Sequence, residues 1–408
     1  MKTKYNLPSE VIFCKECVMS NQRPSSIPEF FHTKNRDGAK YLKIDENGIC
    51  NACNHNNKKK KINWFKREKE LKKLLSKYRK NNGEYDCIIP GSGGKDSAFA
   101  AHVLKYKYKM NPLLVTWPPI LYTDYGLRNF DNWINIGGFD CIVVRPNGKV
   151  MKLLTKLSIE NLLHPFQTFI LGQKNVAPKI ATKFNIKLVF YGENEAEYGN
   201  PIAENETSIR KNSYFIYKKF NDLYLSGVKI KDLLNNYNLK LQDLKIFLPE
   251  KEKEFLTKKI QTRYLGYYLR WNPQEAYYYA AANTGFKPRP FRTQGTYSKY
   301  NSVDDKIDDL HYYTTYMKFG LGRASYDASQ EIRNGHINRK EAKMLVKKYD
   351  GEFPHVYIDE VLNYIDLDKN KFLRLCDKFR SPHLWVKIKN KWKLRHTVNR
   401  DGYNDKKK

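Results

Sequence analysis

The chain has 408 residues, of which 41% are hydrophobic and 14% aromatic, so it is long enough for two or three domains with packed cores. No run approaches about 18 consecutive apolar residues, so no membrane-spanning helix is indicated, and the start of the chain lacks the apolar core of a signal peptide. We therefore expect a cytoplasmic protein. The net charge is +31, but the lysines are spread along the whole chain, so we expect anionic small substrates such as nucleotides rather than nucleic acid.

Two CxxC pairs mark residues 1–60, which we interpret as a zinc-binding module. The four cysteines of these pairs are Cys14, Cys17, Cys50 and Cys53. Each CxxC presents two thiolates from one tight turn, and two such turns complete a tetrahedral shell for Zn²⁺. His55 would be a fifth ligand and is not included. Redox or persulfide-carrying cysteines, as in tRNA thiolases, are the alternative.

Residues 61–83 predict a basic linker helix, and residues 84–200 predict an α/β core. In the core, strands are predicted at 86–89, 112–117, 140–144 and 187–191, and helices near 96–108, 126–136, 149–162 and 173–185. Repeated βα units of this length imply a parallel sheet that is covered on both faces. Ligands then bind at the carboxyl ends of the strands.

The first predicted strand ends in a glycine-rich turn, Pro90-Gly-Ser-Gly-Gly-Lys-Asp-Ser97, which opens a helix. Glycines let backbone N–H groups approach an oxyanion closely, and a helix N-terminus adds free donors. A Walker loop needs Ser or Thr after Lys95, and a dinucleotide loop needs Gly at the same place, but Asp96 stands there. The turn resembles instead the pyrophosphate loop of the ATP pyrophosphatase (PP-loop) superfamily, whose members cleave ATP between the α and β phosphates. A turn without a ligand is the alternative.

Two further segments follow predicted strands and should face the same crevice as the glycine turn. Thr116 and Trp117 end the second strand, and a run of acidic residues follows the fourth. Three carboxylates in five residues are poor core material, so we expect this run to contact substrate or to hold Mg²⁺ on the phosphates of ATP. Its candidate substrate-binding residues are Glu193, Asn194 and Glu197. A solvated acidic loop is the alternative.

Three regions complete the chain: a helical insertion at 201–260, a substrate-binding region at 261–345, and a helical C-terminal region at 346–408 with a basic tail. The insertion either caps the site or mediates contacts between subunits of a homo-oligomer. The second region is a non-periodic run rich in glycine, aromatic and charged residues, which is typical of a binding surface. Its candidate contacts to phosphate, carboxylate, metal or sugar hydroxyl groups are Arg289, Arg292, Lys299, Asp304 and Asp305.

Taken together, these segments resemble the N-acetyl sugar amidotransferase family, bacterial enzymes of surface-polysaccharide and nonulosonic-acid biosynthesis. Besides the CxxC pairs and the glycine turn, the matching segments are 115–117, 122–124, 164–167, 172–174, 191–194, 196–200 and 285–340. The resemblance implies an enzyme that converts an acetamido group on an activated, nucleotide-linked sugar to an acetamidino group. ATP, Mg²⁺ and structural Zn²⁺ are the implied cofactors. A separate glutaminase is implied as the source of ammonia, because Cys87, Cys141 and Cys376 lie within predicted strands or a helix.

The resemblance also implies roles for the glycine turn and for the end of the second strand. The residues implied to bind ATP are Pro90, Gly91, Ser92, Gly93, Gly94, Lys95, Asp96, Ser97, Thr116 and Trp117. Lys95, Asp96 and Ser97 are the expected catalytic residues, and Lys95 would neutralise charge on the leaving pyrophosphate. Two other classes of function stay open: a tRNA-modifying PP-loop enzyme such as a thiolase, and a non-enzymatic nucleic-acid-binding protein.

Overall fold

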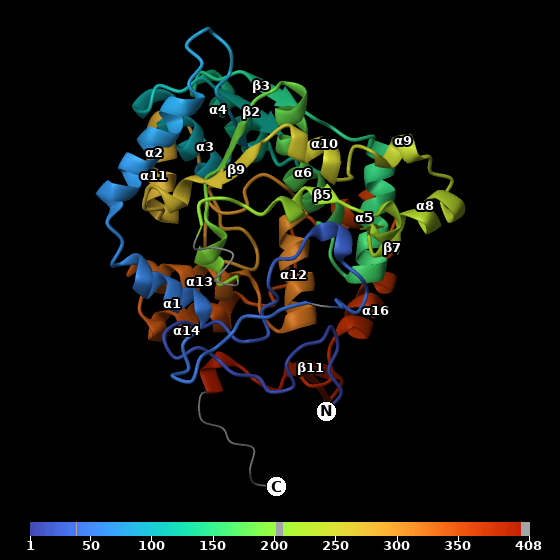
Figure 1. Cartoon of the computed structure of the whole chain (residues 1–408). Coiled ribbons are helices and arrows are strands. Elements are labelled where there is room, and N and C mark those ends of the chain that lie inside the picture. Colours follow the sequence, from blue (N-terminus) through green and yellow to red (C-terminus); the bar gives the residue numbers. More distant parts are fainter. Residues whose placement is uncertain (38, 201–206, 401–408) are drawn as a thin grey trace.

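A five-stranded parallel sheet in the order β3-β2-β1-β4-β9 forms the centre of the computed structural model, which describes residues 1–37, 39–200 and 207–400 (Figure 1). Its strands are β1 (Cys87–Pro90), β2 (Pro112–Thr116), β3 (Cys141–Val143), β4 (Leu188–Tyr191) and β9 (Gln261–Tyr264). Each neighbouring pair is parallel, so all five carboxyl ends lie along one edge of the sheet.

Helices cover both faces of the sheet because successive side chains of a strand point to opposite sides. Ile88 packs into one core with α5 (Gly148–Leu162) and α6 (Gln167–Lys183). Its neighbours Cys87 and Ile89 pack into a second core on the other face. The helices of the second face are α2 (Trp64–Tyr78), α3 (Lys95–His102) with the π-helical turn η2 (Val103–Lys107), α4 (Asp124–Asn135) and α11 (Pro273–Thr284).

The α/β fold predicted from the sequence is confirmed, since the four predicted strands correspond to β1, β2, β3 and β4. The fifth strand, β9, was not predicted. It has only four residues, alternates between half-buried and buried positions, and follows the insertion rather than a helix of the core. It pairs with β4 at the edge of the sheet, so the sheet extends beyond the predicted core range of 84–200.

The insertion consists of short helices and two small sheets that pack against α5 and α6. Its elements are η4 (Asn212–Tyr214), β5 (Ile216–Tyr217), η5 (Phe220–Asp222), β6 (Tyr224–Leu225), β7 (Val228–Lys229), α8 (Ile230–Asn236), α9 (Leu241–Leu244), β8 (Glu250–Lys251) and α10 (Glu252–Thr257). Phe215, Leu225 and Phe247 are buried in the same core as α6. The start of the predicted insertion, 201–206, lies outside the described residues.

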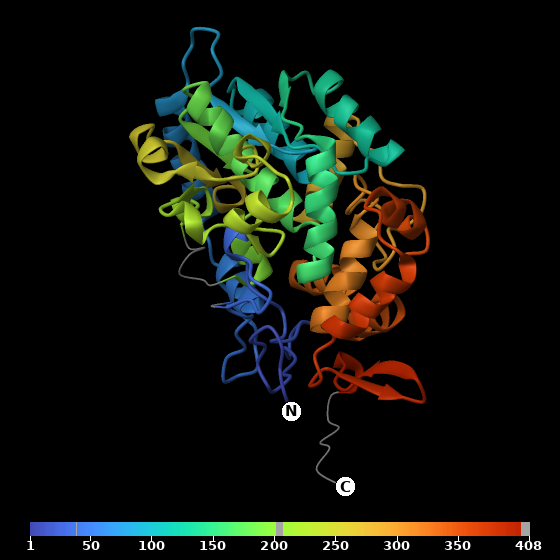
Figure 2. The same ribbon diagram turned by 90° about the vertical axis from the view of Figure 1, so that its right-hand side faces the viewer.

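The N-terminal module and the described C-terminal elements lie side by side below the sheet (Figures 1 and 2). The C-terminal elements are α12 (Asp308–Phe319), α13 (Arg323–Asn334), α14 (Arg339–Tyr349), α15 (Ile358–Tyr364), α16 (Lys369–Phe379), β10 (Trp385–Ile388), β11 (Lys391–Leu394) and η7 (Val398–Arg400). The N-terminal elements are η1 (Glu29–Phe31) and α1 (Asn51–Lys59), while η3 (Glu195–Tyr198) and η6 (Leu265–Tyr267) follow β4 and β9. Met19 and Leu42 pack with Leu321, so the N-terminal module is joined to the C-terminal helices.

Two sequence-based expectations concern the ends of the chain and the membrane. The predicted basic tail at 404–408 lies outside the described residues. In the part of the chain that the structure describes, no helix combines the length and the apolar character needed to cross a membrane.

Candidate active site and metal centre

The glycine turn between β1 and α3 lies at the carboxyl edge of the sheet, and two of its glycines are required by the fold. A Cβ on Gly91 would lie 2.3 Å from the Cβ of Ser97. Gly93 has a φ of +86° and a Cβ there would lie 2.8 Å from the Cα of Phe130. A Cβ on Gly94, in contrast, would meet nothing within 4 Å. Gly94 is the N-cap of α3, so the helix N-terminus is open to an approaching anion.

The polar side chains of the turn are held by residues from distant parts of the chain. Nζ of Lys95 lies 2.5 Å from Oδ2 of Asp96, and Nε1 of Trp271 donates a hydrogen bond of 2.9 Å to the other oxygen of this carboxylate. Oγ of Ser92 donates a hydrogen bond of 2.6 Å to Asp304. The C-terminal half of the chain therefore fixes the orientation of the turn.

Two pockets meet at the glycine turn, and each has a volume of about 470 Å³. They share the lining residues Ser92, Gly94, Asp96, Gln173, Glu193 and Tyr198. We name the first the cationic pocket, after its distinctive lining residues Arg23, Lys174 and Arg210. We name the second the acidic pocket, after Asp304, Asp305, Asp308 and Asp327, which face a single arginine, Arg323, in the described lining.

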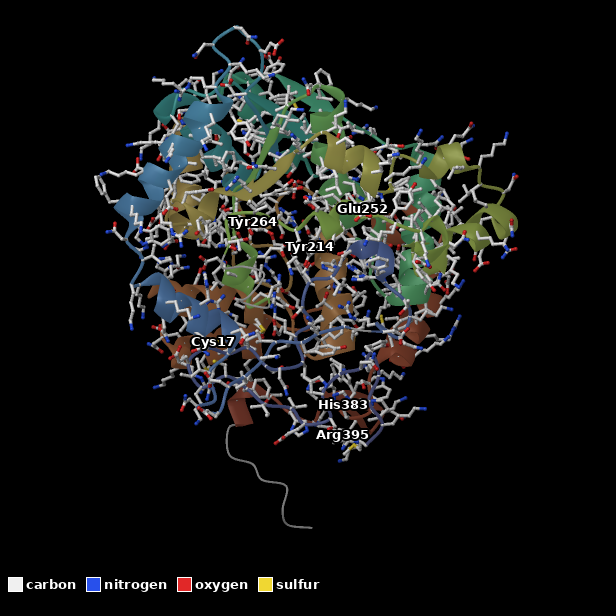
Figure 3. All side chains as sticks on the ribbon, in the orientation of Figure 1. Cys17, Tyr214, Glu252, Tyr264, His383 and Arg395 are labelled. Atoms are coloured by element: carbon white, nitrogen blue, oxygen red, sulfur yellow. The ribbon has the colours of Figure 1, made fainter. Side chains whose placement is uncertain are left out.

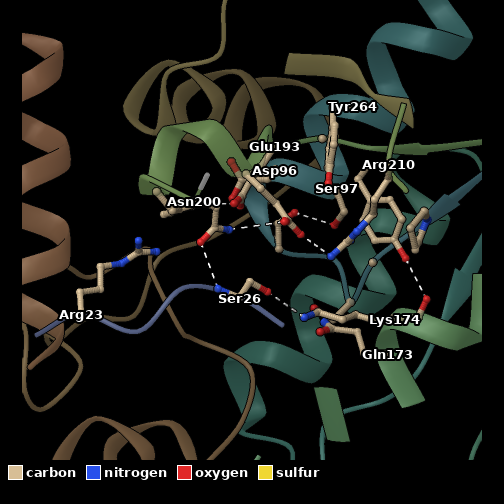
Figure 4. A pocket seen from close by; sticks show the side chains of 18 residues that line it. Arg23, Ser26, Asp96, Ser97, Gln173, Lys174, Glu193, Asn200, Arg210 and Tyr264 are labelled. Atoms are coloured by element: carbon tan, nitrogen blue, oxygen red, sulfur yellow. Dashed lines mark hydrogen bonds and ion pairs between the residues drawn. The ribbon is translucent and has the colours of Figure 1, made fainter. Parts of the chain in front are cut away.

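The cationic pocket is shown in Figure 4, where Arg23 lies on one side and Lys174 and Arg210 on the other. Arg210 is buried and pairs with Glu195, and its guanidinium lies among tyrosine rings. Nζ of Lys174 lies 3.4 Å from a carboxylate oxygen of Glu29. Two of the three cations thus have a carboxylate partner.

The acidic pocket is built where the C-terminal region crosses the end of β2. Asp305 accepts backbone hydrogen bonds from Ile120 at 2.6 Å and Ile307 at 3.0 Å. Burial raises the pKa of Asp305 to about 7. Asp327 pairs with Arg323 at 2.8 Å. Asp305 therefore ties two segments together, while Asp304 contacts the glycine turn directly.

Glu193 lies at the junction of the two pockets. It accepts a hydrogen bond from the hydroxyl of Tyr198. Burial raises the pKa of Glu193 to about 8, and the nearby charge of Asp96 raises it further in the same direction. A carboxyl group with such a pKa exchanges its proton near neutral pH, which is a property of groups that move protons in active sites.

The structure brings together many of the residues singled out in the sequence. Those that line one or both pockets are Pro90, Gly91, Ser92, Gly94, Lys95, Asp96, Ser97, Glu193, Asp304 and Asp305. Gly93 supports the turn from behind, against Phe130. Thr116 donates a hydrogen bond to the carbonyl of Gly91, and Trp117 is buried beneath Gly172.

Other predicted residues lie outside the described lining of both pockets. Asn194 caps η3, and Glu197 accepts a hydrogen bond of 2.5 Å from buried Lys59. Both terminal nitrogens of Arg292 bond to Glu352. The side chain of Arg289 is only 2% exposed, and that of Lys299 is exposed. The contacts of Asn194, Glu197 and Arg292 are those of structural residues. The predicted roles of all five residues in binding stay predictions.

Several pocket residues were not found from the sequence. Arg23 and Arg210 stand outside every motif, and nothing in their neighbourhood marks them. Lys174 belongs to a segment that supports the family resemblance, so the sequence could have identified it as a candidate site residue. Trp271 is one of many aromatic residues in its region, and its hydrogen bond to Asp96 spans 175 positions.

The four cysteines of the N-terminal module form a compact, buried cluster that is competent to bind metal. All ligand atoms lie within 4.8 Å of one another. Sγ of Cys14 lies 3.9 Å from that of Cys53, and Sγ of Cys17 lies 3.7 Å from that of Cys50. Cysteine binds metal as the thiolate, and a bound metal ion deprotonates its cysteine ligands.

A second group of potential ligands, Glu29, His32 and His164, is less suited to a metal. Lys174 already pairs with Glu29. Burial and the charge of Arg36 lower the pKa of His32 well below its ordinary value. The same positive charges oppose the binding of a metal cation.

The cysteine cluster is connected to the glycine turn through α1. Figure 3 shows Cys17 apart from Tyr264, which lines the cationic pocket, and none of the four cysteines is among the described lining residues of that pocket. At the end of α1, Nζ of Lys59 donates hydrogen bonds of 2.5 Å to Glu197 and 2.8 Å to the carbonyl of Trp271. The indole of Trp271 in turn holds Asp96. A metal in the cluster would therefore support the position of a turn residue.

The parallel sheet with this turn at its carboxyl edge is the α/β architecture that the sequence predicts. Residues 294–399 match the family model "LPS biosynthesis protein WbpG-like, C-terminal domain". This part of the chain is similar to that family, and the match supports the resemblance to proteins of surface-polysaccharide biosynthesis.

Similarity to individual proteins either covers a small part of the chain or is low in sequence identity and TM-score. The uncharacterized protein MJ1599 of Methanocaldococcus jannaschii is 37% identical over 86 residues, which cover 16% of this chain and 31% of that protein. The solved NMN synthetase of Francisella tularensis has a TM-score of 0.26 at 15% identity, covering 61% of this chain and 93% of its own. The U34-tRNA thiolase NcsA of Methanococcus maripaludis, solved with its [4Fe-4S] cluster, has a TM-score of 0.25 at 11% identity, covering 81% and 94%. Structural similarity at this level does not bear on the function of the chain.

Proposed function

We propose that the protein is an ATP-dependent amidotransferase of O-antigen, lipopolysaccharide or flagellin-glycan biosynthesis. Its reaction converts the acetamido group of a nucleotide-linked sugar or nonulosonic acid to an acetamidino group, with release of AMP and pyrophosphate. The observation that carries the proposal is that two pockets meet at one glycine turn. ATP and an acceptor can then reach the same point from two sides. The WbpG-like match supports polysaccharide biosynthesis as the setting.

The chemistry requires that a poor electrophile, the amide, be activated. The amide oxygen attacks the α-phosphorus of ATP, an O–P bond forms, and the bond to the β-phosphate oxygen breaks. The open N-terminus of α3 and the ammonium of Lys95 stabilise the charge that develops on the departing pyrophosphate. Mg²⁺, when bound, neutralises phosphate charge. Asp96 and Asp304 are the carboxylates placed to hold it.

Ammonia then adds to the carbon of the O-adenylyl imidate, loses a proton, and AMP leaves. Glu193, at the junction of the pockets, would take this proton in its ionised form, of which a pKa raised to about 8 by burial leaves a minor fraction at neutral pH. Burial raises the pKa of the Cys87, Cys141 and Cys376 thiols, to about 12 for Cys376. Thiols with raised pKa values do not suit a glutaminase nucleophile, so we propose that ammonia comes from a separate glutaminase in the cytoplasm.

We propose that the cysteine cluster holds Zn²⁺ in a structural role. One zinc ion with four thiolates at about 2.3 Å keeps tetrahedral sulfur atoms about 3.8 Å apart, and the two measured separations are 3.9 and 3.7 Å. In a [4Fe-4S] cluster each thiolate binds a different iron, so the sulfur atoms lie farther apart. None of the seven cysteines lies in the described lining of either pocket, which disfavours a thiolase with a persulfide.

The test is incubation of the protein with ATP, Mg²⁺, ammonium and a panel of nucleotide-linked acetamido sugars, followed by mass spectrometry. We expect AMP, pyrophosphate and an amidine product that is lighter than the amide because NH replaces O. Arg374→Gln, on the exposed side of α16, serves as a control that keeps activity. If ATP is cleaved to ADP, or if tRNA rather than a sugar stimulates cleavage, the proposal is wrong.

A further inference from the structure

Asp96, which lines both pockets, is held at each of its two carboxylate oxygens by a different residue. Nζ of Lys95 lies 2.5 Å from Oδ2, and Nε1 of Trp271 donates a hydrogen bond of 2.9 Å to Oδ1. Only the first contact is an ion pair, because the indole N–H is an uncharged donor. Lys95 and Asp96 therefore neutralise each other, while the indole fixes the direction of the carboxylate.

The two charged groups of this pair have separate tasks in the proposed reaction. Lys95 stabilises the charge of the departing pyrophosphate, and Asp96 holds Mg²⁺. A second cation at Oδ2 of Asp96 is repelled by the ammonium beside it, because like charges at such short range interact unfavourably. Binding of Mg²⁺ and ATP therefore requires Lys95 to leave Oδ2 for the phosphates. The indole of Trp271 has no charge that opposes Mg²⁺, so its hydrogen bond to Oδ1 can persist during this exchange.

Trp271 is itself held in place by buried contacts. It is only 2% exposed, and its carbonyl accepts a hydrogen bond of 2.8 Å from Nζ of Lys59. The same ammonium lies 2.5 Å from Glu197, and both members of this ion pair are buried. The following residue, Asn272, is the N-cap of α11. An indole supported in this way is a preorganised donor for a carboxylate.

We propose that Trp271 is a positioning residue for the binding of Mg²⁺ with ATP. Its indole holds Oδ1 of Asp96, so that Oδ2 is directed to Mg²⁺ when Lys95 turns to the phosphates. Without this hydrogen bond the carboxylate can rotate, and Mg²⁺ binding then bears the entropic cost of fixing it. The inference rests on the proposed function, since it presumes that ATP and Mg²⁺ bind at the glycine turn.

The test compares wild type with Trp271→Phe, which removes the N–H donor and keeps an aromatic ring in the buried position. The ligand is α,β-methylene-ATP, which cannot be cleaved between the α and β phosphates. Its affinity for the zinc-loaded protein is measured by calorimetry without Mg²⁺ and with saturating Mg²⁺, and the ratio of the two affinities is the Mg²⁺ factor. We expect Trp271→Phe to lower the Mg²⁺ factor about tenfold, because a hydrogen bond to a charged group is lost. The affinity without Mg²⁺ stays unchanged.

A double-mutant cycle with Asp96→Asn decides whether Trp271 acts through Asp96. If it does, Trp271→Phe lowers the Mg²⁺ factor of wild type but not that of Asp96→Asn, since changes at residues that act together are not additive. Trp392→Phe is the matched control, because Nε1 of Trp392 has no hydrogen-bond partner among the described residues. This control should keep the wild-type Mg²⁺ factor.

Lys59→Gln and Glu197→Gln, made together, are a second way to release the indole. The double change removes the ammonium that supports the carbonyl of Trp271 without leaving a buried carboxylate unpaired. It should also lower the Mg²⁺ factor, and it leaves the Trp271 side chain intact. Zinc content and melting temperature are measured for every variant.

Two results would overturn the inference while the proposed function stands. One is a Mg²⁺ factor that is the same in wild type, Trp271→Phe and the Lys59→Gln/Glu197→Gln protein. The other is an equal effect of Trp271→Phe in wild type and in the Asp96→Asn protein. If wild type does not bind the analogue at any Mg²⁺ concentration, the proposed function fails, and the inference fails with it.

Discussion

The two pockets that meet at the glycine turn have the same volume but differ in charge, because three Lys or Arg side chains and three carboxylates line the first, whereas six carboxylates and two Lys or Arg side chains line the second. The cations of the first come from the N-terminal module, α6 and the segment before β9. The carboxylates that line only the second pocket lie between residues 304 and 327, inside the part of the chain that matches the WbpG-like family. On the proposed function, the turn handles phosphate and the walls on each side determine which groups reach it.

The largest effect is expected from loss of the metal, which would break the cationic pocket by unfolding the module that carries Arg23. Cys17→Ser removes one of four thiolates from a buried cluster. Binding of a structural metal contributes roughly as much as the whole stability of a domain, so we expect loss of metal and a large fall in melting temperature. Cys376→Ser, at a buried cysteine outside the cluster, keeps its metal. Unchanged metal content in Cys17→Ser would contradict the assignment.

The next effect concerns Glu193, which both pockets share. Its pKa is raised from 4.5 to about 8 in the folded protein. The folded state therefore holds a proton that the unfolded state releases, and wild-type stability falls as pH rises between these values. Glu193→Gln has no carboxyl group that titrates in this range. The free energy of unfolding of the variant minus that of wild type should therefore increase by a few kcal/mol between pH 4.5 and 8. Urea unfolding across this range measures the difference, and parallel curves would refute it.

Replacement of Asp96 should reduce AMP formation while both pockets keep their structure. Asp96→Asn keeps the acceptor for the Trp271 indole but removes the negative charge beside Lys95. We expect AMP formation to fall about 10²-fold or more, as for other lost electrostatic contacts in active sites. The melting temperature should change little. A variant with wild-type activity would show that this carboxylate has no part in catalysis.

The smallest effect is expected from Asp304→Asn, which tests whether the two pockets bind different substrates. Asp304→Asn alters only the acidic pocket, where the carboxylate accepts a hydrogen bond from Ser92. We expect KM for ATP to rise about tenfold at most, with KM for the acceptor nearly unchanged. Asp359→Asn, an exposed acid on α15, is the matched control. An equal rise in both KM values would mean that the two pockets do not divide the substrates.

The features that the sequence predicts well are local ones. The βα units from β1 to β4 follow from short apolar runs and helical periodicity, and the glycine turn follows from a contiguous motif. The cysteine cluster follows from the spacing of two turns. Each of these patterns lies within a few neighbouring residues, so no knowledge of distant contacts is needed.

Contacts between distant segments explain what the sequence does not predict. Arg292 has the appearance of a ligand-binding cation, but its partner Glu352 lies 60 positions away. Glu197 follows a strand as a metal or substrate ligand would, yet it pairs with Lys59 across 138 positions. Arg23 shows the reverse case, since it reaches the pocket only because the N-terminal module packs beside the core.

The hydrogen bond from the backbone of Ile120 to Asp305 joins residues 185 positions apart in the chain. A growing chain leaves the ribosome from its N-terminus, so the sheet and the glycine turn emerge long before the carboxylates that line the acidic pocket. A chain that stops short of residue 304 has the turn but only one of the two pockets. On the proposed function, the order of synthesis would therefore delay ATP consumption until the residues that line the acidic pocket have been made.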